Sequence, residues 1–531
     1  MSVKSGNRNL QYVSKRLKLA ALALAMGGAL FATRPYVRAQ EAAQGGTPQG
    51  AEGAIDLGTE LSPTEYLRIE EGAPINVGSE GPRRDPAKEL PMKITAPFTI
   101  AAVGDIIEPD PISERADPGF QSLIKVIRDA DVGFANMESN LVDIHHRDEF
   151  LGPISGTVAP KEIGADIRAM GITMMNRANN HSMDGGEAGI LSTNAILREY
   201  GIVPAGTGAN LDEARAASFR DTPKGRVGLV GMFSMDSGTS DIGPGCCDMG
   251  ADFLRTAATY RVGDLGGKTG VNPLRLTTYH IVTPEQLQML RTFRNSYFGP
   301  AAETVMNGPT DQMKLFDEWY RVGTPAGSLS YTMNPGDERE ILQSIRNGKI
   351  HSDFMIATIH AHQGIQNIGG LRTVSDFLIK LAHECIDNGA DIFLTHGPHM
   401  LEGVEIYKGK PIFYGLASFV FQTDLQILGV PPGDMLTKGR TIYARPINAE
   451  GVVAASHYEG GQLTEVRLYP VDLGGYPRPG SSTGIPTAPT PERARQILEE
   501  LQALSKPFGT TINIENNVGV IHVAAAGSDK K

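Results

Sequence analysis

Histidine is scarce in this sequence, and several of its histidines stand where predicted strands end. Five of the twelve occur in three short stretches, which are Asn180-His181, His360-Ala-His362 and His396-Gly-Pro-His399. A single histidine in such a place is more often a hydrogen-bonded core or loop residue. Several together, joined by Asp105 and by Asn136-Met-Glu138 after two other strands, favour a metal site, because carboxylates neutralise divalent charge while imidazoles and amide oxygens complete the ligand set.

The chemistry that such a set supports is hydrolysis. Ligands on successive strand ends converge without long loops. Two divalent ions about 4 Å apart activate water and bind both sides of an in-line displacement. We therefore expect divalent metal ions as cofactors, two in number and of the Mn, Zn or Fe type.

Alternating strands and helices must position these side chains. Apolar runs predict strands at Phe98–Val103, Val132–Ala135, Ile172–Asn176, Arg226–Phe233, Phe354–Ile359 and Ile392–Leu394. Helical patterns lie between them, at Phe120–Ala130, Pro160–Met170, Gly189–Tyr200, Glu338–Asn347 and Val374–Asn388. This alternation predicts an α/β fold with a layered sheet, in which ligands gather beyond the carboxyl ends of the strands.

Residues 234–336 interrupt this rhythm and are predicted to be an insertion that forms a mobile cover beside the strand ends. The segment is rich in glycine at first and then has helix-like stretches at Pro284–Asn295 and Asp311–Arg321. Trp319 and Tyr320 stand at helical spacing from Phe316, which favours packing within the insertion over a polymer-binding platform. Proteolysis is expected near Gly238–Gly250.

The two ends of the chain have different compositions from the core. Residues 1–39 combine a basic start, an apolar run from Leu19 to Ala32 and Val37-Arg38-Ala39, the pattern of a signal peptide cleaved after Ala39. The basic stretch has features of twin-arginine export, with ordinary unfolded export as the alternative. Residues 40–92 predict a disordered tether, 98–430 the core and 431–525 a small α+β extension with a helix at Pro491–Ser505.

Charge and cysteine content exclude some classes of protein. Removal of residues 1–39 lowers the net charge from −11 to −18, because that segment carries seven basic and no acidic side chains. So acidic a chain is unsuited to nucleic acid or anionic lipid. Three cysteines exclude a disulfide framework, and no run of about 18 apolar residues elsewhere predicts a transmembrane segment.

Several of these blocks resemble the CapA family, the poly-γ-glutamate capsule synthesis proteins. They are Gly104-Asp105, Asn136-Met-Glu138, Ala178–Gly185, Thr358-Ile-His360 and the long run Asn388–Leu401 with Tyr407–Tyr414 and Ser418–Phe421. The resemblance implies a metallophosphoesterase-like (calcineurin-like) α/β sandwich. It also implies metal ligands at Asp105, Glu138, Asn180, His181, His360 and His399. His360 would also be catalytic, and His396 would be either a ligand or the acid near the leaving group.

The sequence departs from the metallophosphoesterase pattern at three places. Position 107 is Ile where a His usually stands, the bridging carboxylate is Glu138 rather than Asp, and His396 and His399 are three residues apart instead of two. One metal site is therefore weak or absent, or His362 supplies the missing imidazole.

The function implied by the resemblance is an exported factor of capsule or exopolymer biosynthesis with a metal-dependent, phosphoesterase-like hydrolase site. An anionic polymer or a small phosphoester or amide is the expected substrate, and a membrane polymer synthase is a possible partner. The alternative is a non-catalytic polymer-binding or synthase-assembly factor on the same fold. Retained ligands favour the enzyme, and the altered first motif favours the binder.

Overall fold

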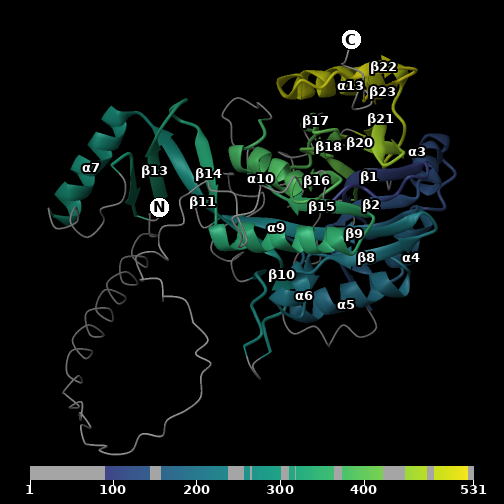
Figure 1. Cartoon of the computed structure of the whole chain (residues 1–531), viewed down its shortest axis with the longest axis horizontal. Helices are drawn as coiled ribbons and strands as arrows, with labels where there is room; N and C mark the ends of the chain where they lie inside the picture. The colour runs from purple at the N-terminus through teal and green to yellow at the C-terminus, as the bar shows by residue number, and fades with distance from the viewer. Residues whose placement is uncertain are drawn as a thin grey trace, which may run out of the picture. The chain divides into compact units, whose positions relative to one another are not determined.

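The computed structural model describes residues 90–143, 157–236, 256–262, 266–299, 310–316, 318–363, 373–422, 449–474 and 484–523 (Figure 1). The chain divides into two units, Met1–Asn76 and Val77–Lys531, and every described residue belongs to the second. The predicted signal peptide, residues 40–89 of the predicted tether and the predicted cleavage region Gly238–Gly250 lie outside the described residues.

The first of two large sheets is built around β1 (Phe98–Ile107), a strand buried along nearly its whole length. On one side follow three parallel strands, β2 (Val132–Met137), β5 (Ile172–Asn176) and β6 (Val203–Ala205). On the other side lie antiparallel β20 (Glu450–Glu459), β21 (Gln462–Asp472), β23 (Val518–His522) and β22 (Asn513–Glu515). The short β19 (Ser418–Phe421) pairs in parallel with the end of β1.

The second sheet is centred on β15 (Phe354–His360), which lies between β9 (Gly225–Asp236) and β16 (Ile392–His396), all parallel. Beyond β16 come β18 (Lys410–Phe413) and β17 (Val404–Tyr407), and beside β9 lie β8 (Ser218–Thr222) and β11 (Pro273–Val282). In β9, β15 and β16 consecutive residues are buried, with no alternation between buried and exposed positions. These strands are therefore covered on both faces, as is usual in parallel sheets.

The two sheets pack face to face, with helices on the outside. Phe98 and Ile100 of β1 share one apolar core with Phe354 and Ile356 of β15. A second core lies under α3 (Pro118–Asp129), α4 (Ile163–Ala169) and α5 (Gly186–Glu199), and a third under α9 (Pro335–Ile350) and α10 (Asp376–Asp387). The predicted layered α/β sandwich is confirmed.

Short elements complete the core. A pair of parallel strands, β3 (Asn140–Val142) and β4 (Val158–Pro160), follows β2, and β7 (Thr207–Gly208) pairs with β10 (Gly270–Val271). The N-cap of helix α6 (Leu211–Arg215) is Asn210, whose side chain accepts a hydrogen bond from the Glu213 backbone N–H. The helix α13 (Pro491–Ser505) has the bounds predicted from sequence and runs into a 3-10 turn at Lys506–Phe508.

The insertion contains a small lobe, which we define as α7 (Pro284–Phe298) with the strands β11, β12 (Gln312–Leu315), β13 (Glu318–Val322) and β14 (Leu329–Met333). A helix was expected over Pro284–Asn295, and α7 confirms it. The helix predicted over Asp311–Arg321 is wrong, because β12 and β13 form an antiparallel hairpin there. Met313 and Leu315 are buried and alternate with more exposed residues, a strand period that the aromatic spacing concealed.

The C-terminal part of the chain is more closely integrated than a separate extension. β20 pairs directly with β1 from Phe98 to Ala102, and β21 pairs with β20 along its whole length. The segment after residue 449 therefore completes the first sheet. β11 likewise joins β9, so the lobe continues the second sheet.

Candidate metal centre

The site begins where β1 ends, at Asp105. Its carboxylate is fully buried, and its backbone N–H donates to the Ala417 carbonyl at 3.0 Å. The preceding residue must be glycine, because a Cβ on Gly104 would lie 1.7 Å from that same carbonyl oxygen. The close crossing of β1 and the chain before β19 thus fixes the position of Asp105.

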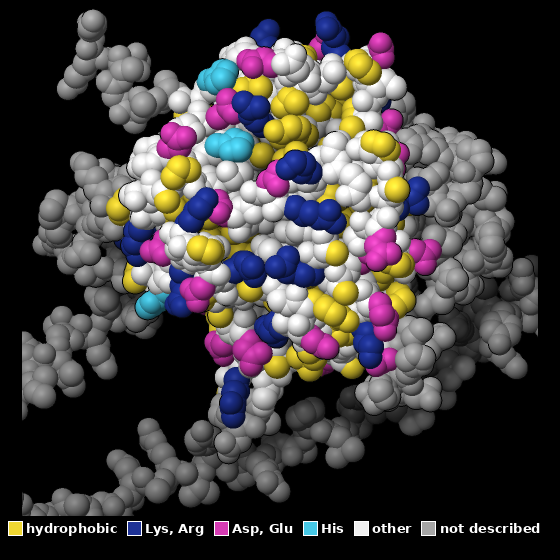
Figure 2. All heavy atoms as spheres, turned by 90° about the vertical axis from the view of Figure 1, so that its right-hand side faces the viewer, with side chains coloured by type: hydrophobic (Ala, Val, Ile, Leu, Met, Phe, Trp, Pro, Cys, Tyr) yellow, Lys and Arg dark blue, Asp and Glu magenta, His cyan; other side chains and the backbone are white. Residues whose placement is uncertain are grey.

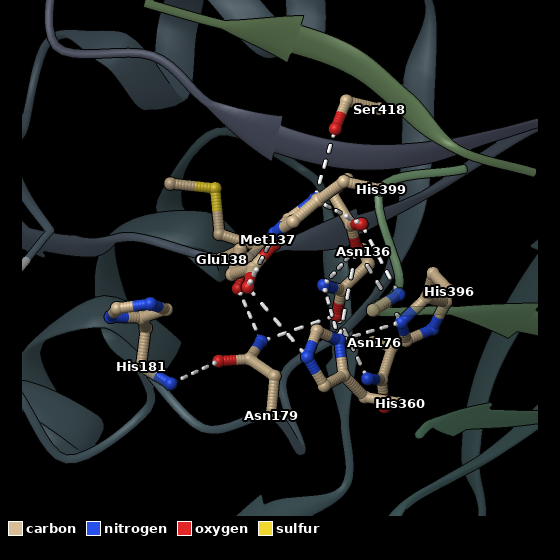
Figure 3. A network of polar contacts seen from close by, with 12 residues as sticks. Asn136, Met137, Glu138, Asn176, Asn179, His181, His360, His396, His399 and Ser418 are labelled. Atoms are coloured by element: carbon tan, nitrogen blue, oxygen red, sulfur yellow. Dashed lines mark hydrogen bonds and ion pairs between the residues drawn. The ribbon is translucent and has the colours of Figure 1, made fainter. Parts of the chain in front are cut away.

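A chain of buried amides orients the Asp105 side chain. The Asn136 side chain donates from Nδ2 to Asp105 Oδ1 at 2.8 Å, while its own Oδ1 accepts from Asn176 at 2.9 Å and from Asn179 at 3.2 Å (Figure 3). The Gly397 N–H donates to Asp105 Oδ2 at 3.2 Å. These donors favour the ionised carboxylate.

The second sheet supplies two imidazoles opposite this carboxylate. His360 and His396 are paired in register at the ends of β15 and β16, and their Nδ1 atoms lie 3.0 Å apart. Each Nδ1 is 3.7 Å from Asp105 Oδ1, and Thr358 Oγ1 lies 3.0 Å from His396 Nε2. Ligand-type atoms of Asp105, His360 and His396 all lie within 4.8 Å of one another, so this first group could hold a metal ion.

A second group lies beside the first. It consists of Glu138, His362 and His399, whose ligand-type atoms also lie within 4.8 Å of one another. His399 has a left-handed φ of 54°, Nδ1 3.1 Å from Asp105 Oδ2 and Nε2 3.8 Å from Glu138 Oε1. Its Nδ1 is also 3.0 Å from Ser418 Oγ. His399 and Asp105 therefore connect the two groups.

Electrostatics keep these groups in their metal-binding protonation states. Burial, with smaller contributions from neighbouring imidazoles, lowers the pKa of His362 to about 3 and that of His360 well below its ordinary value. Burial also lowers the pKa of His396, to about 4. Burial alone would raise the pKa of Asp105, but its contacts with His399, His396 and Asn136 lower it. Neutral imidazoles and an ionised carboxylate are the forms that bind metal.

Two buried side chains have polar atoms that a metal ion could bind. Both ring nitrogens of His362 are buried without a hydrogen-bond partner among the described residues, and so is Oδ1 of Asn180. Burial of an unpaired polar atom costs about 1–3 kcal/mol, so such atoms in a native site call for an explanation. The mixture of imidazole, carboxylate and amide donors is suited to divalent ions of the Zn, Mn or Fe type.

His181 belongs to neither group, although it is close enough to act electrostatically on His360 and His362. Its side chain is 30% exposed, and Nδ1 lies 2.7 Å from Asp184 Oδ2. Its backbone N–H donates to Asn179 Oδ1 at 3.1 Å, which connects it to the amide chain (Figure 3). Asp184 therefore orients the His181 ring, and it does not cap α5, whose N-cap is Gly185 and which has no side-chain cap hydrogen bond.

The structure thus brings together five of the predicted site residues: Asp105, Glu138, His360, His396 and His399. Asn180 is buried, and the next residue, His181, is more exposed. His362 was expected only as a substitute ligand, yet it belongs to the second group. The signal for it is the spacing His360-Ala-His362, because residues two apart in an extended chain point to the same side. The supporting amides Asn136 and Asn176 carry no comparable signal in the sequence.

Comparisons with known proteins identify the family of the chain. A family model described as bacterial capsule synthesis protein PGA_cap matches residues 99–423. Two uncharacterized proteins of Sinorhizobium fredii, y4sH and y4uA, are each 36% identical over 456 residues, which cover 80% of this chain and 93% of theirs.

Two further similarities cover less or are weaker. The PGA biosynthesis protein CapA of Bacillus subtilis is 37% identical over 116 residues, 22% of this chain and 29% of that protein. A crystal structure of a phosphatase from Mycoplasma pneumoniae aligns over 71% of this chain and 94% of its own, with a TM-score of 0.32 and 9% identity. Among the described residues, no helix is long and apolar enough to cross a membrane.

Proposed function

The chain belongs to the bacterial capsule synthesis protein family PGA_cap, and from this premise we propose that it is an exported, metal-dependent hydrolase of capsule metabolism. The observation that carries the proposal is the pair of buried groups at the strand ends of two facing sheets. In one of them no described residue hydrogen-bonds to either ring nitrogen of His362. Structural polar networks are normally satisfied internally, whereas these atoms are not.

We assign the residues as follows. Asp105, His360 and His396 hold one divalent ion, and Glu138, His362 and His399 hold the other, with Asn180 as a further oxygen donor. Two such ions supply Lewis-acid activation of water and neutralise charge that develops during an in-line displacement. Both retained carboxylates are needed to balance the cation charge in a fully buried site.

His181 has the exposure needed by a group that meets the leaving group. His396 is fully buried and has neighbours at both ring nitrogens, so we assign it to the metal rather than to acid catalysis. Asp184 holds Nδ1 of His181, which leaves Nε2 as the nitrogen that would exchange a proton with substrate. The sequence analysis had expected His181 as a metal ligand and His396 as either a ligand or the acid near the leaving group.

The substrate class follows from the metals and the family. We propose a phosphoester or an amide within or attached to an anionic polymer, reached after export through a signal peptide cleaved after Ala39. The non-catalytic alternative, a polymer-binding or synthase-assembly factor, draws support from Ile107. This side chain packs in the apolar core where a metallophosphoesterase usually has a histidine.

A hydrolysis panel tests the proposal. The exported form, reloaded with Mn²⁺ or Zn²⁺, should hydrolyse at least one of three probes: a phosphomonoester, a phosphodiester and a γ-glutamyl oligomer. Chelation and Asp105→Asn should each abolish that activity. A metal-loaded protein inactive on all three, but still required for polymer production in cells, would favour the assembly factor.

A further inference from the structure

Arg321 of β13 is one of several arginines whose described hydrogen-bond partners are all neutral, as Arg128 and Arg177 also are. Its Nε donates to Gln312 at 3.2 Å, its Nη2 lies 3.5 Å from Thr332 Oγ1, and its guanidinium stands 3.5 Å from the centre of the Tyr279 ring. These partners, among the described residues, are all neutral. By contrast, carboxylates pair with Arg215, Arg226, Arg275, Arg467 and Arg493.

The neighbours of Arg321 form one face of the lobe. Strand pairing sets Trp319 beside Tyr279 and Lys314, and Arg321 beside Gln312, while Ser330 and Thr332 of β14 pair with Tyr279 and Thr277. Paired residues point to the same side of a sheet. Ile281 of β11, which pairs with Arg321, lies on the same side. We call this set the Arg321 face: Thr277, Tyr279, Ile281, Gln312, Lys314, Trp319, Arg321, Ser330 and Thr332.

The other side of the lobe is apolar and covered. Leu287 of α7 packs there with Met313 and Leu315 of β12, and these side chains alternate with those of the Arg321 face. The Arg321 face itself has two cations, two aromatic rings, the buried Ile281 and several hydroxyl or amide groups. One described carboxylate, Asp376 of α10, accepts a hydrogen bond from Ser330 of this face. In a chain of net charge −11 the two cations are a local concentration of positive charge.

We propose that the Arg321 face binds an extended anionic polymer through its repeated carboxylates. The Arg321 guanidinium uses Nε for Gln312 and one N–H of Nη2 for Thr332, so the remaining N–H groups of Nη1 and Nη2 can donate to a planar carboxylate while the ring of Tyr279 covers one face. Lys314 adds a second charge one strand away. Trp319, which packs against Tyr279 with ring centres 5.9 Å apart, offers a flat surface to the polymer backbone. The charge of Arg321 then finds its counter-ion in the ligand.

This inference rests on the proposed function only for the class of polymer, because the face is separate from the metal-binding groups. β11 joins β9, which pairs with β15, so the Arg321 face and His360 belong to one continuous sheet. A polymer held on the lobe would raise the local concentration of its bonds near the strand ends. The sequence analysis had assigned Trp319 to packing, and the strand geometry gives it this further role.

Intrinsic fluorescence provides a direct test, because Trp319 is the single tryptophan of the chain. Titration of the exported, chelator-treated protein with poly-γ-glutamate at low ionic strength should change its emission saturably, and the change should weaken with salt. Polygalacturonate, a carboxylated polysaccharide, is titrated in parallel to distinguish the two polymer chemistries. Uncharged dextran should have no effect.

Two variants assign the effect to this face. Arg321→Gln should weaken binding at least about tenfold, since a charge-assisted contact is lost. Thr332→Glu, at an exposed position beside Arg321, should do the same by supplying an internal counter-ion. Matched controls are Arg467→Gln on β21 and Phe293→Ala on α7, and both should bind as the wild type does.

Three results would overturn the proposal: flat titrations with both polyanions, an equal response to dextran, or unchanged binding in both Arg321→Gln and Thr332→Glu. Since the protein is free of metal, none of them bears on the hydrolase site. A protein that binds the polymer but hydrolyses none of the three probes would contradict only the proposed function.

Discussion

At the scale of residues, the centre consists of side chains that are costly to bury unless a ligand compensates them. Asp105, Glu138, His360 and His396 are fully buried, and His362 and His399 almost so. Only part of their polar capacity is used within the protein, as the two His362 nitrogens show. These buried groups could therefore hold a cation, as the proposed function requires.

Substitution of His181 and of His396 should have different effects on metal content and turnover. We expect His181→Ala to retain its metal and to lose turnover, most strongly for poor leaving groups, because the lost group acts on substrate. His396→Ala should lose metal and turnover together. Metal content and hydrolysis of two esters of different leaving-group pKa provide the measurement, and loss of metal from His181→Ala would restore that residue to the ligand set.

At the scale of elements, the crossing of β1 with the chain before β19 positions the first carboxylate. Gly104→Ala should lower the free energy of unfolding by about 1–3 kcal/mol or more, because the new Cβ would press on the Ala417 carbonyl. Gly266→Ala is the control, since an added Cβ there meets no atom within 4 Å. Chemical denaturation measures both, and equal stabilities would contradict the close crossing.

Glu384 of α10 should give stability a pH dependence. Burial, aided by Glu338, raises the pKa of Glu384 to about 7 from the ordinary 4.5, against the opposing effect of Lys380. The folded state therefore binds the proton more tightly than the unfolded chain, so this residue lowers stability as the pH rises from about 4.5 to 7.

Glu384→Gln should remove that loss and make the protein more stable than the wild type above pH 7. Denaturation of chelated protein at pH 5 and pH 7.5 measures the difference between the two proteins. Glu499→Gln on α13 is the control and should keep the wild-type pH slope. An unchanged slope in Glu384→Gln would show that this carboxyl titrates normally.

At the scale of the whole molecule, the sequence predicted the strands of the core well and the added parts less well. The bounds of β5 and α13 were obtained outright, because apolar runs and caps mark buried elements clearly. The β12–β13 hairpin was mistaken for a helix, since Phe316, Trp319 and Tyr320 fit either period over so short a span. The amide chain from Asn136 to Asn176 depends on tertiary contacts that no local pattern records.

Charge on the surface is mixed, as in an ordinary globular protein. Figure 2 shows Lys and Arg interspersed with Asp and Glu over the face at the right of Figure 1. That face therefore carries no continuous field of positive charge.

Export is the prediction that belongs to the whole chain. The basic start, the apolar run to Ala32 and Val37-Arg38-Ala39 predict a mature protein that begins at Gln40. N-terminal sequencing of protein from the producing cells measures this directly. A mature protein that still begins at Met1 or Ser2 would contradict the export part of the account.

The central claim is a centre with two metal ions, and metal-to-protein ratios by elemental mass spectrometry test it most directly. We expect about two divalent ions per wild-type chain and about one in His362→Leu. The control His383→Ala should keep about two, because the His383 ring stacks on Tyr407 and belongs to neither metal-binding group. After chelation, His362→Leu should melt no lower than the wild type, because the removed imidazole has no described hydrogen-bond partner. A wild-type protein that binds no stoichiometric metal, or a His362→Leu variant that keeps the full complement, would contradict the account.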